Sequence, residues 1–227
     1  MKQLLILILM GGAALACTPA FADTCSGDIS NQTLKKLDVT ATCFGDNVTV
    51  DGGVVVNPGA SLQLTNSTVR GGINVNGGSL ILPTAANHGR NDIDGGIVMM
   101  YNSSVLSALA LFDSDINGQL SISGLSGGSS SGGGLACGKV NGELCNLKID
   151  GGLTLSNSDS KCGKMVIGTS LASCPGSKIY GGVILDNSVV GSLFNNTVKG
   201  GLFCINGGAV SNKANNNIAG KITCAGF

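Results

Sequence analysis

The sequence predicts an all-β protein, a parallel β-solenoid, and three observations carry this prediction. A seven-residue pattern recurs eight times between residues 50 and 224, which suggests about eight coils. Inside each copy apolar and variable residues alternate, which is the period of a β-strand. The first glycines of successive copies lie 19 to 33 residues apart, and the shortest steps match the two or three short strands and turns of one solenoid coil.

Each copy has a β-branched residue, a variable residue and a glycine pair, followed by apolar, variable and apolar residues. The glycine pair becomes Gly-Gln in one copy and Gly-Lys in another. Glycine pairs and β-branched flanks disfavour a helix, so the copies are expected to be strands. The copies are VDGGVVV (50–56), VRGGINV (69–75), IDGGIVM (93–99), INGQLSI (116–122), IDGGLTL (149–155), IYGGVIL (179–185), VKGGLFC (198–204) and IAGKITC (218–224).

The first 22 residues read as a signal peptide. Lys2 gives a positive start, residues 4–10 are apolar, and Ala20-Phe21-Ala22 forms a small-x-small cleavage site before Asp23. The alternative is a lipoprotein signal that ends at Cys17, which would then carry the lipid. Either signal predicts an exported protein, periplasmic or extracellular.

Composition supports export and excludes some partners. Apart from Cys17, eight cysteines remain, which in an exported chain predicts four disulfides and no zinc. Lys plus Arg equals Asp plus Glu at 13 each, so no attraction to nucleic acid is expected. No apolar run of about 18 residues follows the signal, and no transmembrane segment is therefore predicted.

The chain divides into a signal peptide (1–22), an N-terminal cap (23–49) and the β-helix (50–227). A cap is expected because the end of a solenoid exposes an unpaired strand edge. The two long steps between copies indicate loop insertions at about 123–148, which contains GLSGGSSSGGG, and at about 156–178.

Cysteine positions in the repeat predict one disulfide from register. Cys204 and Cys224 both stand four residues after the first glycine of their copies. Equivalent residues of stacked strands lie about 4.8 Å apart, within the Cα separation that a disulfide accepts. The remaining pairs are expected to be local: Cys25 with Cys43, Cys137 with Cys145, and Cys162 with Cys174.

The turns and one surface column have their own chemistry. Asparagine recurs between copies, for example in TNST (65–68) and FNNT (194–197), where it suits left-handed backbone and hydrogen-bonded ladders. The variable residue before the glycines should form an exposed column, which we interpret as a charge ladder, with a ligand or cation site as the alternative. Its members are Asp51, Arg70, Asp94, Asn117, Asp150, Tyr180, Lys199 and Ala219.

Together, the eight motifs and the export signal resemble the pectin-lyase-like superfamily, and in particular small secreted bacterial proteins of that architecture. The resemblance covers roughly residues 48–227 and implies a single-stranded right-handed parallel β-helix. It is a resemblance of architecture, which does not imply an activity.

Polysaccharide lyases and polygalacturonase-like hydrolases share this architecture, so an enzyme is one alternative. The hydrolases carry Asn-Thr-Asp, Asp-Asp, Gly-His-Gly and Arg-Ile-Lys motifs, whereas this chain has only Asn-His-Gly-Arg-Asn-Asp (87–92) around its sole histidine. His88, Arg90 and Asp92 are therefore weak candidate catalytic residues. No cofactor and no metal site is predicted, and Trp, a common sugar platform, is absent from the sequence.

The function predicted from these features is a non-enzymatic scaffold that presents an Asn, Ser, Thr and Gly surface at the cell envelope or outside the cell, adhesin-like or structural. Its expected partners are a polysaccharide or an envelope or extracellular protein. One alternative is a polysaccharide-active lyase or hydrolase. Another is a self-assembling envelope subunit, which would associate through the ends of the solenoid because stacked strands leave edges there.

Overall fold

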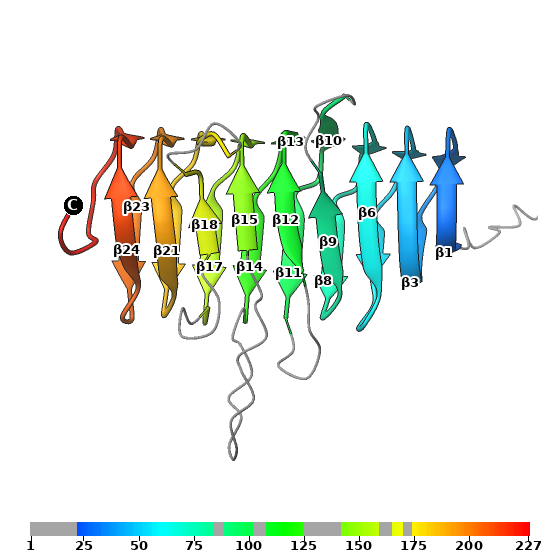
Figure 1. The fold of residues 1–227 in the computed structure, drawn as a ribbon. Coiled ribbons are helices and arrows are strands. Elements are labelled where there is room, and N and C mark those ends of the chain that lie inside the picture. The colour runs from blue at the N-terminus through cyan, green and yellow to red at the C-terminus, as the bar shows by residue number, and fades with distance from the viewer. Residues whose placement is uncertain (1–21, 84–88, 102–107, 125–141, 159–164, 170–173) are drawn as a thin grey trace, which may run out of the picture.

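The computed structural model describes residues 22–83, 89–101, 108–124, 142–158, 165–169 and 174–227. Every regular element in these ranges is a β-strand. Seen from one side, strands from β1 to β24 stand next to one another in a continuous row, and short strands lie along one edge of that row (Figure 1). In the described part of the chain no helix is long and apolar enough to cross a membrane.

Two rows of strands make up a 16-stranded sheet and are joined at β3 (Leu37–Asp46), with β1 (Asp23–Ser30) paired to β3. Row A contains β5 (Val54–Val56), β8 (Ile73–Asn76), β11 (Ile97–Met100), β14 (Leu120–Ser123), β17 (Leu153–Ser156), β20 (Val183–Asp186) and β23 (Leu202–Ile205). Row B contains β6 (Ser61–Thr65), β9 (Ser79–Leu82), β12 (Leu109–Phe112), β15 (Gly142–Cys145), β18 (Met165–Ile167), β21 (Val189–Phe194) and β24 (Ala209–Ala214).

A separate sheet of nine very short strands, here called the narrow sheet, forms the third side. It contains β2 (Thr33–Leu34), β4 (Thr49–Val50), β7 (Thr68–Val69), β10 (Asn91–Ile93), β13 (Ser114–Ile116), β16 (Lys148–Ile149), β19 (Lys178–Ile179), β22 (Thr197–Val198) and β25 (Asn217–Ile218). From β4 onwards the chain visits the narrow sheet, row A and row B in turn.

Every strand pair is parallel, and the glycine motifs lie in register with one another. Ile97 pairs with Ile73 on one side and with Leu120 on the other. In the first six copies the two alternating apolar residues after the glycine pair are buried, as Val54 and Val56 are in β5, while Val55 between them is exposed. The predicted all-β, parallel solenoid-like repeat fold is thus confirmed.

The first glycine of each copy is required by close approach of neighbouring backbones. A Cβ atom on Gly151 would lie 2.7 Å from the carbonyl oxygen of Gly118 and 2.9 Å from the nitrogen of Gln119, closer than real Cβ atoms come. The second glycine has more room in places: a Cβ on Gly53 would meet its nearest atom, the oxygen of Gly71, at 3.4 Å. The two copies that depart from the glycine pair, with Gln119 and Lys221, do so at this second position.

Asparagine occupies left-handed backbone at the turns, as its position in the sequence predicts. Asn47 and Asn66 have φ values of 53° and 49° at the corner between row B and the narrow sheet. The amide Nδ2 of Asn47 donates to Oδ1 of Asn31, 2.7 Å away, in the neighbouring turn. At the opposite corner, Asn187 Nδ2 donates to Asn157 Oδ1 at 3.1 Å. These amides link successive turns along two exposed corners.

The segment predicted as an N-terminal cap (23–49) forms strands that continue the same sheets. β1 pairs with β3, and Thr33 of β2 pairs with Thr49 of β4. The predicted loop insertions likewise contain the strands β15 and β18, which continue row B through Leu144 and Ile167. Their three or four residues lie between segments without a repeat motif, so the sequence pattern did not reveal them.

Two predicted disulfides are present in the structure. Cys204 bonds to Cys224, with Cα atoms 4.8 Å apart, and Cys25 bonds to Cys43, with Cα atoms 5.7 Å apart. Cys224 is buried, whereas Cys204 is only partly buried although its strand position faces inward. The pairing of Cys204 with Cys224 follows from the register of the glycine motifs.

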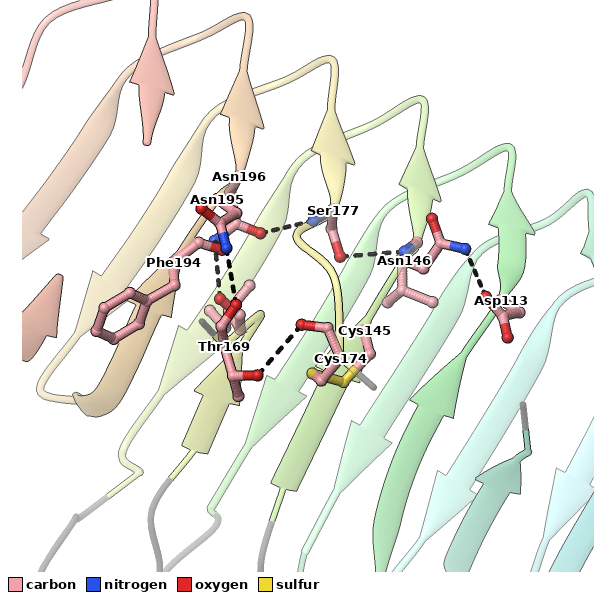
Figure 2. The surroundings of a disulfide bond; sticks show 11 residues. Asp113, Cys145, Asn146, Thr169, Cys174, Ser177, Phe194, Asn195 and Asn196 are labelled. Carbon is pink, nitrogen blue, oxygen red and sulfur yellow. Dashed lines mark hydrogen bonds between the residues drawn. A yellow bond between two sulfur atoms is a disulfide. The ribbon is translucent and has the colours of Figure 1, made fainter. Parts of the chain in front are cut away.

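The two other predicted pairings are wrong, because Cys145 bonds to Cys174 with Cα atoms 4.9 Å apart (Figure 2). Cys137 and Cys162, their predicted partners, lie outside the described residues. Cys145 ends β15, and the chain after β18 returns beside it, since Asn146 N donates to Pro175 O at 2.9 Å. Cys145 is therefore bonded to a cysteine in the neighbouring turn of the stack, 29 residues away, and not to the nearby Cys137.

Peptide mapping without reduction should therefore find Cys145 and Cys174 in one disulfide-linked peptide pair. Trypsin has lysines at 139, 148, 164 and 178 with which to separate these cysteines from one another. The Cys204–Cys224 peptide pair serves as an internal standard in the same digest. A peptide that joins Cys145 to Cys137 would contradict the structure.

Candidate functional site

Of the predicted cluster of His88, Arg90 and Asp92, the last two lie at the corner that leads from row B into β10. His88 is outside the described residues. The Arg90 guanidinium is held by neighbouring turns of the scaffold: Nε donates to Asp115 Oδ1 at 2.9 Å, and Nη2 donates to the carbonyl oxygens of Ser114 (3.1 Å) and Asn146 (3.0 Å). Arg90 thus ties several turns together, which leaves it poorly placed to bind a substrate.

Asp92 belongs to an acidic patch on the outer face of the narrow sheet. It pairs directly with Asp115 of the next strand, and Asp94 follows two residues along. Asn117 Nδ2 donates to Asp92 Oδ1 at 3.0 Å and to Asp94 Oδ1 at 2.7 Å. Burial, and then the negative charges of Asp94 and Asp115, raise the pKa of Asp92 above its usual value.

The charge ladder predicted along the same sheet is present in part. Arg70 Nη1 forms an ion pair with Asp51, its neighbour in the column. Further along, Lys148 Nζ lies 3.1 Å from Asp150 Oδ1 and 5.9 Å from the centre of the Tyr180 ring. In the described ranges no group of three or more His, Cys, Asp or Glu side chains could hold a metal ion.

Replacing Asp92 by asparagine should raise the melting temperature at pH 7. A carboxyl group with a raised pKa in the folded state costs stability once it ionises, so wild-type stability should fall as pH rises from below the usual aspartate pKa through the raised value. Like charges directly opposite on neighbouring strands cost about 0.2 to 1 kcal/mol. The gain should vanish at acid pH, as thermal melts at both values would show.

Asp51→Asn is the matched control, because it removes a carboxylate from the same sheet that is paired with Arg70. This variant should leave the melting temperature unchanged or lower it slightly. A lower melting temperature for Asp92→Asn at pH 7 would contradict the repulsive arrangement.

A hollow on the outer face of row B, near β1, is the site that sequence reasoning missed. It has a volume of about 150 Å³ and is lined by side chains in two stacked columns. The register pairs Asp28 with Phe44 and Phe44 with Gln63 in one column, and Ser30 with Asp46 and Asp46 with Thr65 in the other. The side chains of each column occupy outward positions on neighbouring paired strands, so the spacing of the strands fixes the spacing of these side chains.

The hollow combines an apolar face with hydrogen-bond acceptors. The Phe44 side chain is exposed (46%), unlike the apolar residues of the core. The Thr65 hydroxyl donates to Asp46 Oδ1 at 2.8 Å, which orients that carboxylate. The sequence signal for this site is one aromatic residue, Phe44, among polar residues in β3. The sequence pattern alone places this stretch in an N-terminal cap, so it does not single out Phe44 as a site residue.

No family model, curated protein or solved structure matches the chain. The functional argument therefore rests on this chain's own residues.

Proposed function

We propose that the protein is an exported, non-enzymatic scaffold, wound as a right-handed parallel β-helix of about eight coils, that binds polysaccharide at the cell envelope or outside the cell. The proposal includes removal of residues 1–22 as a signal peptide. The three disulfides among the described residues favour an oxidising, non-cytoplasmic environment. The observation that carries the binding function is the hollow around Phe44.

The chemistry of the hollow suits a sugar ring. An exposed aromatic ring offers an apolar face to the C–H groups of a sugar. Asp28 and Asp46 beside it are acceptors for sugar hydroxyl groups, and Gln63 can both donate and accept. The lining is mostly polar, with Phe44 as its one large apolar side chain, which suits a ligand rich in hydroxyl groups better than an apolar one.

The surroundings extend this subsite into a longer polar surface. From the hollow, the corner beside the narrow sheet continues with the exposed asparagines Asn31, Asn47 and Asn66. Side chains on successive strands repeat about every 4.8 Å, so this corner presents amides at regular intervals. A polymer with repeated hydroxyl groups is the ligand class that such spacing favours.

The test is a binding screen of the mature chain against immobilised neutral and acidic polysaccharides, with release of reducing ends or unsaturated products measured in parallel. Binding without cleavage is expected. Phe44→Ala and Asp46→Asn should each weaken binding, whereas Val98→Ala, an equally exposed apolar residue (46%) on row A, should not. Absence of binding to every polysaccharide would overturn the ligand class.

A second candidate, a polysaccharide-active lyase or hydrolase, is favoured by the raised pKa of Asp92 beside Asp94 and Asp115. A carboxyl group whose pKa lies above its usual value is better suited than an ordinary aspartate to act as a general acid. The same screen tests it. Turnover that is lost in both Asp92→Asn and His88→Ala would replace the scaffold proposal with an enzymatic one.

A further inference from the structure

The last strand of row B carries a charged residue at a position that is otherwise buried and apolar. Register pairing places Lys213 opposite Leu193, at the end of an inward column. The five members of this column that precede Lys213 are buried apolar residues, namely Leu82, Leu111, Leu144, Ile167 and Leu193. A cation that points into the end of a β-stack discourages another strand from adding there.

The segment 219–227 folds back over this end of the stack. Leu202 N donates to Lys221 O and Thr223 N donates to Leu202 O, both at 2.9 Å, so the segment adds to the edge of β23. The Cys204–Cys224 disulfide fixes it there. Its final residue reaches row B, where the centre of the Phe227 ring lies 4.3 Å from Lys213 Nζ. Phe227 thereby lies against the one lysine of β24.

Each end of the stack has an exposed strand edge, β1 at one end and β24 at the other. The two strands run in the same direction, and the two ends carry opposite net charge. β24 ends the strand order of row B, and among the described strands β1 pairs only with β3. Residues 23–51 contain five aspartates and two lysines, whereas residues 178–227 contain four lysines and one aspartate. Edges of parallel strands with opposite charge are suited to head-to-tail pairing, in which β1 of one copy continues row B of another.

We propose that residues 219–227 are a disulfide-fastened cap that prevents β24 from pairing with β1 of a second copy of this chain. The partner for the surface beneath the cap is the N-terminal edge of an identical molecule. A head-to-tail contact does not close on itself, so copies without the cap would add one after another into a filament.

The test compares the mature chain with two uncapped variants. Phe227→Ala combined with Lys213→Leu removes the cover and the inward charge, and Cys204→Ser combined with Cys224→Ser releases the segment from β23. The weight-average mass of each uncapped variant in analytical ultracentrifugation should rise by about twofold or more as its concentration is raised. Phe227→Tyr keeps an aromatic ring over Lys213 and should behave as the wild type.

Two further measurements identify the contact and exclude misfolding. Asp28→Lys in the Phe227→Ala, Lys213→Leu background should restore the monomer, because it reverses a charge in the part of β1 that is in line with row B. Hydrogen exchange of the assembled variant should slow in both β1 and β24 while the rest of the stack stays as protected as in the wild type. Uncapped variants that remain monomeric, or protection gained in β24 alone, would overturn the proposal.

Discussion

Gly151→Ala should lower the free energy of unfolding by about 3 kcal/mol, at the upper end of the usual cost of overpacking. Gly151 stands where the chain leaves the narrow sheet for row A, and its backbone lies directly against Gly118 of the neighbouring turn. A methyl group there would be 2.7 Å from a carbonyl oxygen that accepts the hydrogen bond of Gly151 N. The two backbones would have to separate, and that hydrogen bond would be lost. Urea unfolding followed by far-UV circular dichroism measures the effect.

Gly53→Ala is the matched control, since it adds the same methyl group at the second glycine of a motif. Its new Cβ would have its nearest contact at 3.4 Å, and Gly53 does not use the left-handed backbone that favours glycine. Loss of backbone freedom in the unfolded chain should offset a small crowding cost, so stability should change by less than about 1 kcal/mol. Equal effects of the two substitutions would show that the close approach at Gly151 is not what selects glycine.

Asn196→Ala should cost about 3 kcal/mol, because it leaves several buried backbone groups without partners. Asn196 is only 1% exposed. Its Oδ1 accepts from Ser177 N at 2.7 Å, and its Nδ2 donates to the oxygens of Ile167 (2.7 Å) and Phe194 (2.9 Å), so one side chain joins three segments (Figure 2). Thermal unfolding should shift to lower temperature, and exchange of the Ser177 amide proton should accelerate.

The neighbouring Asn195→Gly is the control for this prediction. Asn195 is exposed and has a φ of 58°, a conformation that glycine adopts without strain, and its Nδ2 donates to Thr169 O at 2.8 Å. Loss of this one exposed hydrogen bond should cost less than about 1 kcal/mol. A control as destabilising as Asn196→Ala would mean that turn geometry, and not buried hydrogen bonding, dominates at this corner.

The sequence was sufficient to predict those parts of the fold that repeat. Glycine pairs, alternating apolar residues and asparagine turns each recur, so their register could be aligned, and Cys204 with Cys224 followed from that alignment. β15 and β18 lack a glycine motif and lie between low-complexity or cysteine-containing segments. Their place depends on pairing with residues 23 or more positions away in the sequence, which no local pattern expresses. For the same reason Cys145 was assigned to a sequence neighbour.

The candidate site was less predictable than the fold, because its residues come from different strands. Arg90 and Asp92 were recognised as polar residues near the only histidine, but the use of Arg90 as a tie to Asp115 depends on stacking across 25 residues. The hollow at Phe44 combines residues of β1, β3 and β6, none of which forms a motif by itself. Asn196 reads as one more turn asparagine, although its side chain is buried.

The three described disulfides, at sequence separations of 18, 29 and 20, each join layers that already touch. Under tension applied at its two ends, a stack of this kind would unravel from the outside, one layer after another. Cys25–Cys43 and Cys204–Cys224 hold the first and last layers to the layers beneath them, so little chain can be drawn out at either end. Force would instead reach the central strands, where many hydrogen bonds run along the pulling direction and must break together. We therefore expect the fold to resist stretching, as a short, stiff tether would.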